Sequence, residues 1–277
     1  MTGRIILSIF LTVLILSFPG CGRPQVQPDP DELVRLWDEP STLDPHLARD
    51  ADSAVILVEI FGGLVTLDTD LKIVPDLAES WTISPDGRTY TFSLQRDASF
   101  HDGKPVTADD VKWSLERPAD PRTQSTTVDT YLGDIVGVRE RLRGETSEVA
   151  GIKVIDDYTV AITIDAPKAY FISKLTYPTA FILDRDNVES GPQWFKTANG
   201  TGPFRLKEYV PGNRIILESN TSYHLGPPIL KRIRFLLSGG QPMVMYENNE
   251  IYITGVELAD LKRLLDPASP LKDELHR

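Results

Sequence analysis

Cysteine and histidine are scarce in this sequence, and the scarcity excludes several kinds of site. The 277 residues include one cysteine and four histidines, so no disulfide can form within the chain. The histidines are scattered and lack the paired spacing of a zinc site. His101 could be a metal ligand or a general base, but a surface or turn role is favoured. No metal site and no cofactor are predicted.

Positive charge is also in short supply. Lys and Arg total 29 against 40 Asp and Glu, for a net charge of −11, and no long run of one sign occurs. This balance argues against nucleic-acid binding, which requires a basic surface, and favours a solvated acidic surface over a site for cationic ligands. The sequence also lacks a Gly-x-Ser-x-Gly elbow, a His-Glu-x-x-His motif and a Cys–His pair. Enzymatic activity is therefore not expected, and a secreted hydrolase is the weakest hypothesis.

The first 20 residues have the features of an export signal. Arg4 provides a short basic start, and residues 5–18 are mostly apolar. This stretch is too short to cross a hydrocarbon core of about 30 Å comfortably, but it suits the apolar region of a signal peptide. We predict a signal peptide over residues 1–20.

The single cysteine, Cys21, follows Gly20 directly after this apolar stretch. Its position resembles a bacterial lipobox, in which the cysteine is acylated and becomes the mature N-terminus, although Phe18 and Pro19 differ from the usual residues. The alternative is an ordinary buried cysteine. Residues 21–32 contain three prolines and are typical of an extended tether. The pattern predicts an exported protein of the cell envelope, either lipid-anchored to the outer face of the cytoplasmic membrane or periplasmic.

Turn residues between alternating apolar positions predict three antiparallel hairpins. Their strands lie at residues 81–83 and 89–94, at 152–154 and 160–164, and at 204–206 and 215–217. Helices are expected over residues 108–116, where Thr107 is a candidate cap, and over residues 257–265. In the second helix, Leu258, Leu261 and Leu265 recur at helical spacing and should face the core. The fold class predicted is mixed α/β, of the α+β kind.

Several ordered blocks carry a family resemblance. They are EPSTLDP at residues 39–45, IFGGL at 60–64, PDLAESW at 75–81, GTGPF at 200–204, and a long block over residues 84–111 that contains SPDG, YTFSL and FHDGKPVTADDV. A block of this length is far more specific than a short motif. Together these residues resemble extracellular solute-binding protein family 5, which includes the oligopeptide, dipeptide and nickel-binding proteins of ABC importers. The resemblance covers about residues 33–265.

The resemblance implies a fold of the periplasmic-binding-protein type II kind, of which this chain holds the first lobe only. We expect residues 33–52 and 177–277 to form the lobe core and residues 53–176 to form an inserted subdomain. In the family, a helix ending in a Gly-Glu-Ile-Asp pattern precedes a large second lobe. Here Asn249-Glu250-Ile251-Tyr252 stands in that place and the sequence ends at Arg277. The expectation is a fragment, a truncated product or one piece of a split protein.

The resemblance also implies a ligand site. Its residues are Glu39, Pro40 and Ser41, which would offer backbone hydrogen bonds to an extended peptide, together with Phe61, Thr201 and Gly202, which would border the cleft. The Glu39 carboxylate would also be placed to meet a ligand amine. Structural alternatives are open for each of these residues. Glu39 could pair at the surface, Phe61 could belong to the core, and Gly202 could serve only its turn.

The function implied is that of a substrate-binding lipoprotein of an ABC importer. It would capture a peptide or peptide-like small solute as a monomer, without a cofactor, and deliver it to the permease subunits. The ligand stays open among dipeptide, oligopeptide, nickel chelate and sugar. The alternative is a truncated cell-surface interaction or sensing lipoprotein that does not transport.

Overall fold

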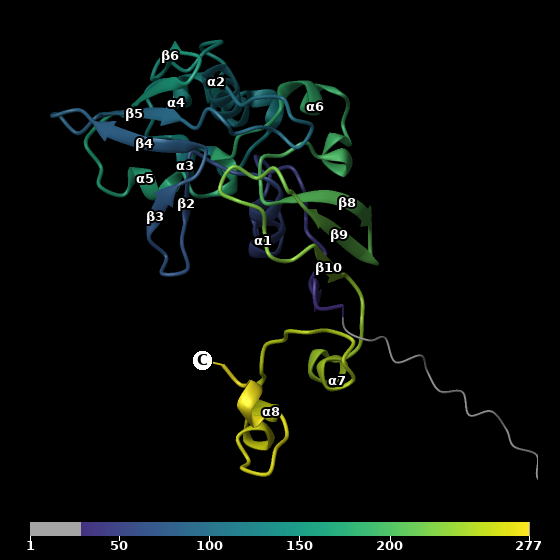
Figure 1. Ribbon diagram of the computed structural model, residues 1–277. Coiled ribbons are helices and arrows are strands. Elements are labelled where there is room, and N and C mark those ends of the chain that lie inside the picture. Colours follow the sequence, from purple (N-terminus) through teal and green to yellow (C-terminus); the bar gives the residue numbers. More distant parts are fainter. Residues whose placement is uncertain (1–28, 277) are drawn as a thin grey trace, which may run out of the picture.

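A computed structural model describes residues 29–276 of the chain (Figure 1). The predicted signal peptide and Cys21 lie outside the described residues. One four-stranded sheet has the order β1-β10-β9-β8. Its strands are β1 (Glu32–Leu36), β8 (Phe204–Val210), β9 (Arg214–Ser219) and β10 (Arg232–Leu236). The edge strand β1 pairs in parallel with β10, while the other two pairings are antiparallel. We call this the first sheet.

The second sheet is also four-stranded, is antiparallel throughout and has the order β4-β5-β7-β6. Its strands are β4 (Ala78–Ile83), β5 (Thr89–Leu94), β6 (Ile152–Asp156) and β7 (Thr159–Thr163). A separate ribbon joins β2 (Val65–Leu67) to β3 (Ile73–Pro75). The longer helices are α1 (Ala51–Ile60) and α2 (Ala108–Glu116).

Shorter helices connect and cover these elements. They are α3 (Val128–Leu132), α4 (Val138–Leu142), α5 (Phe171–Lys174), α6 (Arg185–Glu189), α7 (Pro242–Glu247) and α8 (Leu258–Leu264). Single turns of 3-10 helix occupy Arg117–Ala119, Pro121–Thr123, Pro178–Ala180, Trp194–Thr197 and Lys272–Glu274. Within residues 29–276, no helix is both long and apolar enough to cross a bilayer.

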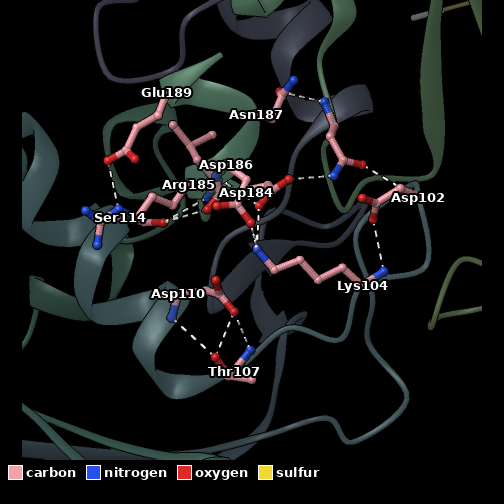
Figure 2. A network of polar contacts seen from close by, with 12 residues as sticks. Asp102, Lys104, Thr107, Asp110, Ser114, Asp184, Arg185, Asp186, Asn187 and Glu189 are labelled. Atoms are coloured by element: carbon pink, nitrogen blue, oxygen red, sulfur yellow. Dashed lines mark hydrogen bonds and ion pairs between the residues drawn. The ribbon is translucent and has the colours of Figure 1, made fainter.

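The three predicted hairpins and the first predicted helix are confirmed. In β5, Tyr90, Phe92 and Leu94 are buried on one face, because alternate side chains of a strand point the same way. The turn before β5 closes at Gly87, whose φ of 69° is costly for other residues. Helix α2 begins after Thr107, where the Asp110 carboxylate accepts a hydrogen bond from the Thr107 N–H at 2.9 Å (Figure 2). This reciprocal cap fixes the helix start.

Two large hydrophobic cores result, one beneath each sheet, and a smaller cluster joins Val34 of β1 to Met245 and Ile251. The core of the second sheet includes Phe92, Phe100 and Leu115. Helix α1 packs on the first sheet, because its buried residues belong to the same core as Phe235. Figure 1 shows α1 beside β8 and β9, away from the second sheet. The predicted domain boundaries at residues 53 and 177 stay predictions.

The predicted apolar stripe of the C-terminal helix is wrong. Leu258 is 88% exposed and Leu265 is 43% exposed, whereas Leu264 is the buried leucine at 2%. Helix α8 ends at Leu264, and Figure 1 shows that it lies apart from the body formed by the two sheets, whereas Met245 of α7 packs with Val34 of β1. Periodic leucines find no core to face there, and only Leu264 turns toward the α7 residues Met243 and Tyr246, with which it lines a hollow.

Candidate functional site

An irregular segment follows β1 and leaves the first sheet. The Trp37 N–H donates to the Leu236 carbonyl at 2.9 Å, which is the last backbone bond of this segment to the sheet. Beyond it, the N–H groups of Asp38, Glu39 and Ser41 and the C=O groups of residues 38–41 have no hydrogen-bond partner among residues 29–276. Backbone polar groups need a partner in protein or solvent. These groups are therefore available to water or to a ligand.

The side chains of this segment are bound to the protein. The Glu39 carboxylate accepts hydrogen bonds from the Tyr209 hydroxyl and, at 2.7 Å, from the Gly212 N–H. Burial and this carboxylate raise the pKa of Tyr209. The Ser41 hydroxyl donates to Asp50, the cap residue of α1. Side chains thus fix the segment between the β8–β9 hairpin and α1, while its backbone stays free.

A hollow of about 440 Å³ opens where β1 ends. Its walls come from three parts of the chain, namely Arg35, Leu36, Trp37 and Asp38 from β1 and its extension, Asp52 from α1, and Pro242, Ile253, Thr254 and Gly255 from the C-terminal part. The third wall is held to the edge of the first sheet, because the Tyr252 N–H donates to the Val34 carbonyl at 2.8 Å. The volume falls within the range of small-ligand sites.

The other predicted contact residues do not line this hollow. They meet in a buried contact between residues 60–62 and the loop at residues 200–202, which we call the joint. Phe61 is 1% exposed and lies edge-on to Trp194, with ring centroids 6.2 Å apart. The Thr201 hydroxyl accepts a hydrogen bond from the Gly62 N–H at 2.9 Å, and the Gly202 N–H donates to the Ile60 carbonyl at 2.9 Å. The structure brings these residues together, but their role toward a ligand stays a prediction.

His101 belongs to the same joint. Its Nε2 donates to the Gly202 carbonyl at 3.1 Å, and its Nδ1 accepts from the Gly200 N–H at 3.2 Å. Burial, at 8% exposure, lowers the pKa of His101 to about 4. The residue stands in the turn after Phe100, which agrees with the predicted turn role, but it is buried. It connects the long block at residues 84–111, which we call the signature block, to the loop at residues 200–202. Groupings of side chains suited to a metal ion are absent from residues 29–276.

Sequence reasoning missed a buried ionic cluster that includes residues of the LDPH stretch at positions 43–46. The Arg117 guanidinium donates to both carboxylate oxygens of Asp44, at 2.9 and 2.6 Å, and to the Nδ1 of His46 at 3.0 Å. His46 in turn donates from Nε2 to the Phe181 carbonyl at 3.0 Å. Burial and the nearby Arg117 charge lower the pKa of His46 to about 4. The closely spaced Asp44 and His46 were the only signal for this cluster, because Arg117 is 71 residues beyond His46 along the chain.

A second polar network ties the signature block to α6. Lys104 donates to Asp184 at 2.7 Å and to Asp186 at 3.0 Å, and Figure 2 shows its side chain reaching both from the turn that holds Asp102. The hydrogen bond to Asp184 raises the pKa of Lys104. The buried Asp184 carboxylate also accepts from the Asn199 amide at 2.8 Å, so both of its oxygens have partners within the protein and the network holds the turn to α6.

Comparison with known proteins decides the family. Residues 72–272 match the model of the bacterial extracellular solute-binding proteins, family 5 Middle. The chain belongs to this family. It is 36% identical over 191 residues to the periplasmic oligopeptide-binding protein OppA of Escherichia coli, covering 67% of this chain and 35% of OppA. It is 34% identical over 213 residues to the periplasmic murein peptide-binding protein MppA of the same species, covering 74% of this chain and 39% of MppA.

Solved structures of family 5 proteins have the same fold. The murein tripeptide binding protein MppA of Escherichia coli superimposes with a TM-score of 0.81 at 31% identity, over 86% of this chain and 48% of MppA. The OppA of Haemophilus influenzae, in complex with the peptide RPPGFSPFR, gives a TM-score of 0.79 at 26% identity, over 85% of this chain and 48% of that chain. The predicted family and the mixed α/β fold are confirmed. The chain spans about a third of the length of the curated relatives it matches.

Proposed function

We propose that this chain is the peptide-contacting part of a substrate-binding protein of an ABC importer. The observation that carries the proposal is the free backbone of residues 38–41, which begins at Asp38 on the wall of a hollow of about 440 Å³. The names of its relatives support the ligand class, since OppA and MppA are described as oligopeptide- and murein-peptide-binding. A further solved relative, from Borrelia burgdorferi, is described as an oligopeptide ABC transporter protein and is 30% identical.

The proposed contact is the addition of a ligand strand. An extended peptide would pair its own N–H and C=O groups with those of residues 38–41, as in other complexes in which a peptide joins an exposed strand. Main-chain pairing gives affinity without reading the peptide sequence. Alternate side chains of the peptide would point into the hollow or into solvent. In a protein with a second lobe, contacts with both lobes would stabilise a closed state that the permease recognises.

Backbone methylation of a peptide tests the pairing. We expect the purified chain to bind tri-alanine more weakly than about 1 µM, because the hollow is open on one side and covers little of the ligand. Methylating the amide nitrogen of residue 2 or of residue 3 should have unequal effects, since alternate N–H groups of a paired strand face its partner. One methylated peptide should lose at least about tenfold in affinity by calorimetry, and the other should bind nearly as well as tri-alanine. Equal affinity for all three peptides would contradict strand addition. Sub-micromolar binding of tri-alanine would contradict the prediction that the open hollow binds weakly.

We further propose that Cys21 carries a lipid anchor. The support is its place after the apolar stretch and before a proline-rich tether. Expression in a bacterial host with a fatty-acid label should give labelled protein in the membrane fraction. The variant Cys21→Ser should be unlabelled and released. Label that persists in this variant would show that the cysteine is not the acylated residue.

A further inference from the structure

The connection between β9 and β10 presents an apolar tip. Ile229 is 97% exposed, which is the largest exposed fraction among the large apolar side chains of residues 29–276, and Leu225 is 48% exposed. Pro227, which stands between them, is exposed as well. We call residues 225–229 the apolar loop. Single exposed apolar residues are ordinary, but two on one five-residue tip can enter the same apolar medium, and leaving water is favourable for both.

Buried contacts hold the apolar loop at both ends. Before the tip, the His224 side chain is 1% exposed and its Nε2 lies 3.0 Å from the Asp76 carboxylate. After the tip, Leu230 packs against the core of the first sheet. The Lys231 N–H then donates to the Asp31 carbonyl at 2.8 Å. A loop that the protein orders in advance loses little conformational freedom when it binds.

The apolar loop lies beside the point where the chain enters the first sheet. The Lys231 ammonium pairs with the Asp31 carboxylate, so the end of the loop and the residue before β1 are in contact. Eight residue steps separate Asp29 from Cys21, and they span at most about 28 Å. If Cys21 is acylated, this corner of the first sheet stays within about 28 Å of the lipid surface. Figure 1 shows β1 and β10 at the end of the molecule opposite β6.

The charge around the apolar loop favours contact through apolar groups. The net charge of −11 repels the chain as a whole from anionic lipids. The loop, however, lies within residues 219–246, the longest stretch without an acidic residue in the described part of the chain. Lys231 and Arg232 follow the loop and lie within ion-pair distance of Asp31 and Glu32, respectively. The base of the loop is therefore close to neutral, and its apolar side chains supply the attraction to lipid.

We propose that the apolar loop inserts into the lipid surface that holds Cys21, with Leu225 and Ile229 as the inserted side chains. This inference rests on the proposed lipid anchor and adds a second, non-covalent contact to it. Two membrane signals together bind far more firmly than either alone. An acylated cysteine at the end of a tether fixes only a distance, whereas the anchor and the inserted loop together fix how the first sheet faces the membrane.

Quenching by lipids tests the inference on the full chain, acylated in a bacterial host and reconstituted into vesicles of phosphatidylcholine and phosphatidylglycerol. Acylation blocks the thiol of Cys21, so Pro227→Cys supplies the one free thiol for an environment-sensitive dye. The dye should shift its emission to the blue in vesicles. Lipids brominated near the headgroup should quench it more than lipids brominated at the chain end, because interfacial side chains lie about 5–10 Å into the boundary.

Ile155→Cys is the matched control for the position of the dye. Ile155 is also an exposed isoleucine, at 61%, but it lies in β6 at the opposite end of the molecule (Figure 1). A dye at this position should show neither the shift nor the quenching. Ile229→Asp, added to Pro227→Cys, should abolish both effects, and Ile229→Leu should retain both. Circular dichroism establishes that each variant is folded.

The outcomes separate the inference from the proposals beneath it. Equal dye signals at residues 227 and 155 in acylated, vesicle-bound protein overturn the inference and leave the lipid anchor and peptide binding standing. A signal at residue 227 that Ile229→Asp leaves unchanged overturns it too. Absence of acyl label at Cys21 overturns the proposed anchor and the inference with it. A blue shift that requires added permease subunits, and is absent in vesicles of lipid alone, shows a protein partner and overturns the lipid contact.

Discussion

Buried charge in this protein is tolerated where each group has a full set of partners. Asp44 is almost fully buried, yet both of its carboxylate oxygens accept from Arg117. Arg117 also reaches His46 and lies 5.7 Å from the Trp194 ring centroid. The cluster connects the LDPH stretch, the end of α2 and residue 181. Removing one member of the cluster should destabilise the fold, because a buried ion left alone is far less stable than a satisfied pair.

Arg117→Met should destabilise the protein by about 3–5 kcal/mol, because it leaves the Asp44 carboxylate buried without its counter-ion. The free energy of unfolding in urea measures the effect. Arg122→Met is the control, since the Arg122 side chain is 90% exposed and its partner Asp120 keeps a second cation, Arg141, at 3.5 Å. That variant should unfold at the same urea concentration as the unaltered chain. Equal stability of both variants would show that the buried pair contributes nothing.

The buried residues His46 and His101 predict a loss of stability in mild acid. Each has a pKa of about 4 in the folded protein and one near 6.5 in the unfolded chain. The unfolded chain therefore binds protons first as the pH falls. The contribution is complete above pH 6.5 and is lost between pH 6.5 and pH 4, up to about 3 kcal/mol for each residue. Urea midpoints measured across this range check the slope. His101→Gln should lower the slope, and an unchanged slope would show that His101 is not the titrating group.

Local elements were predictable wherever local chemistry determines them. The β4–β5 hairpin follows from the Pro85, Asp86 and Gly87 turn, and α2 follows from its Thr107 cap. The parallel pairing of β1 with β10 was not predictable, because the paired residues Glu32 and Arg232 are 200 positions apart. Helix α8 had the right period, but the period does not say whether a core lies against it.

The candidate site was predictable only in part, for the same reason. The segment at residues 39–41 was identified through a family block, and the structure leaves its backbone free. The hollow beside it depends on residues 253–255 returning to the edge of β1. No local pattern in the sequence predicts that residues 253–255 return to β1.

Close backbone contact between α1 and the loop at residues 200–202 gives an element-scale prediction. A Cβ atom at Gly202 would lie 2.5 Å from the Glu59 carbonyl oxygen, so the backbone must move to accept a side chain. Gly202→Ala should destabilise the protein by at least about 2 kcal/mol, as measured by urea unfolding. Gly240→Ala is the control, because its added Cβ would meet only Met245 at an ordinary 3.9 Å. If both variants are as stable as the unaltered chain, the contact is not tight in solution.

At the scale of the whole molecule, the two sheets are connected by buried polar contacts as well as by the chain. His101 and the loop at residues 200–202 form one connection. The Ile182 N–H donates to the Gly62 carbonyl at 2.9 Å in another, and the buried Asp76 carboxylate lies 3.0 Å from the Nε2 of His224 in a third. Opening one core would remove one partner of each contact and leave the other partner unpaired in the core that stays closed, which costs free energy. The two cores should therefore unfold together.

Matched core variants test this coupling. Phe92 is buried beneath the second sheet and Phe235 beneath the first, so Phe92→Leu and Phe235→Leu remove comparable contacts from different cores. Each should lower the stability by about 1–2 kcal/mol. If the protein unfolds in one step, both variants shift a single transition, and circular dichroism and tryptophan fluorescence report the same midpoint. Two transitions, with Phe92→Leu moving only one of them, would mean that the joint does not couple the cores. The first sheet, with the hollow at the end of β1, would then keep its shape independently of the signature block.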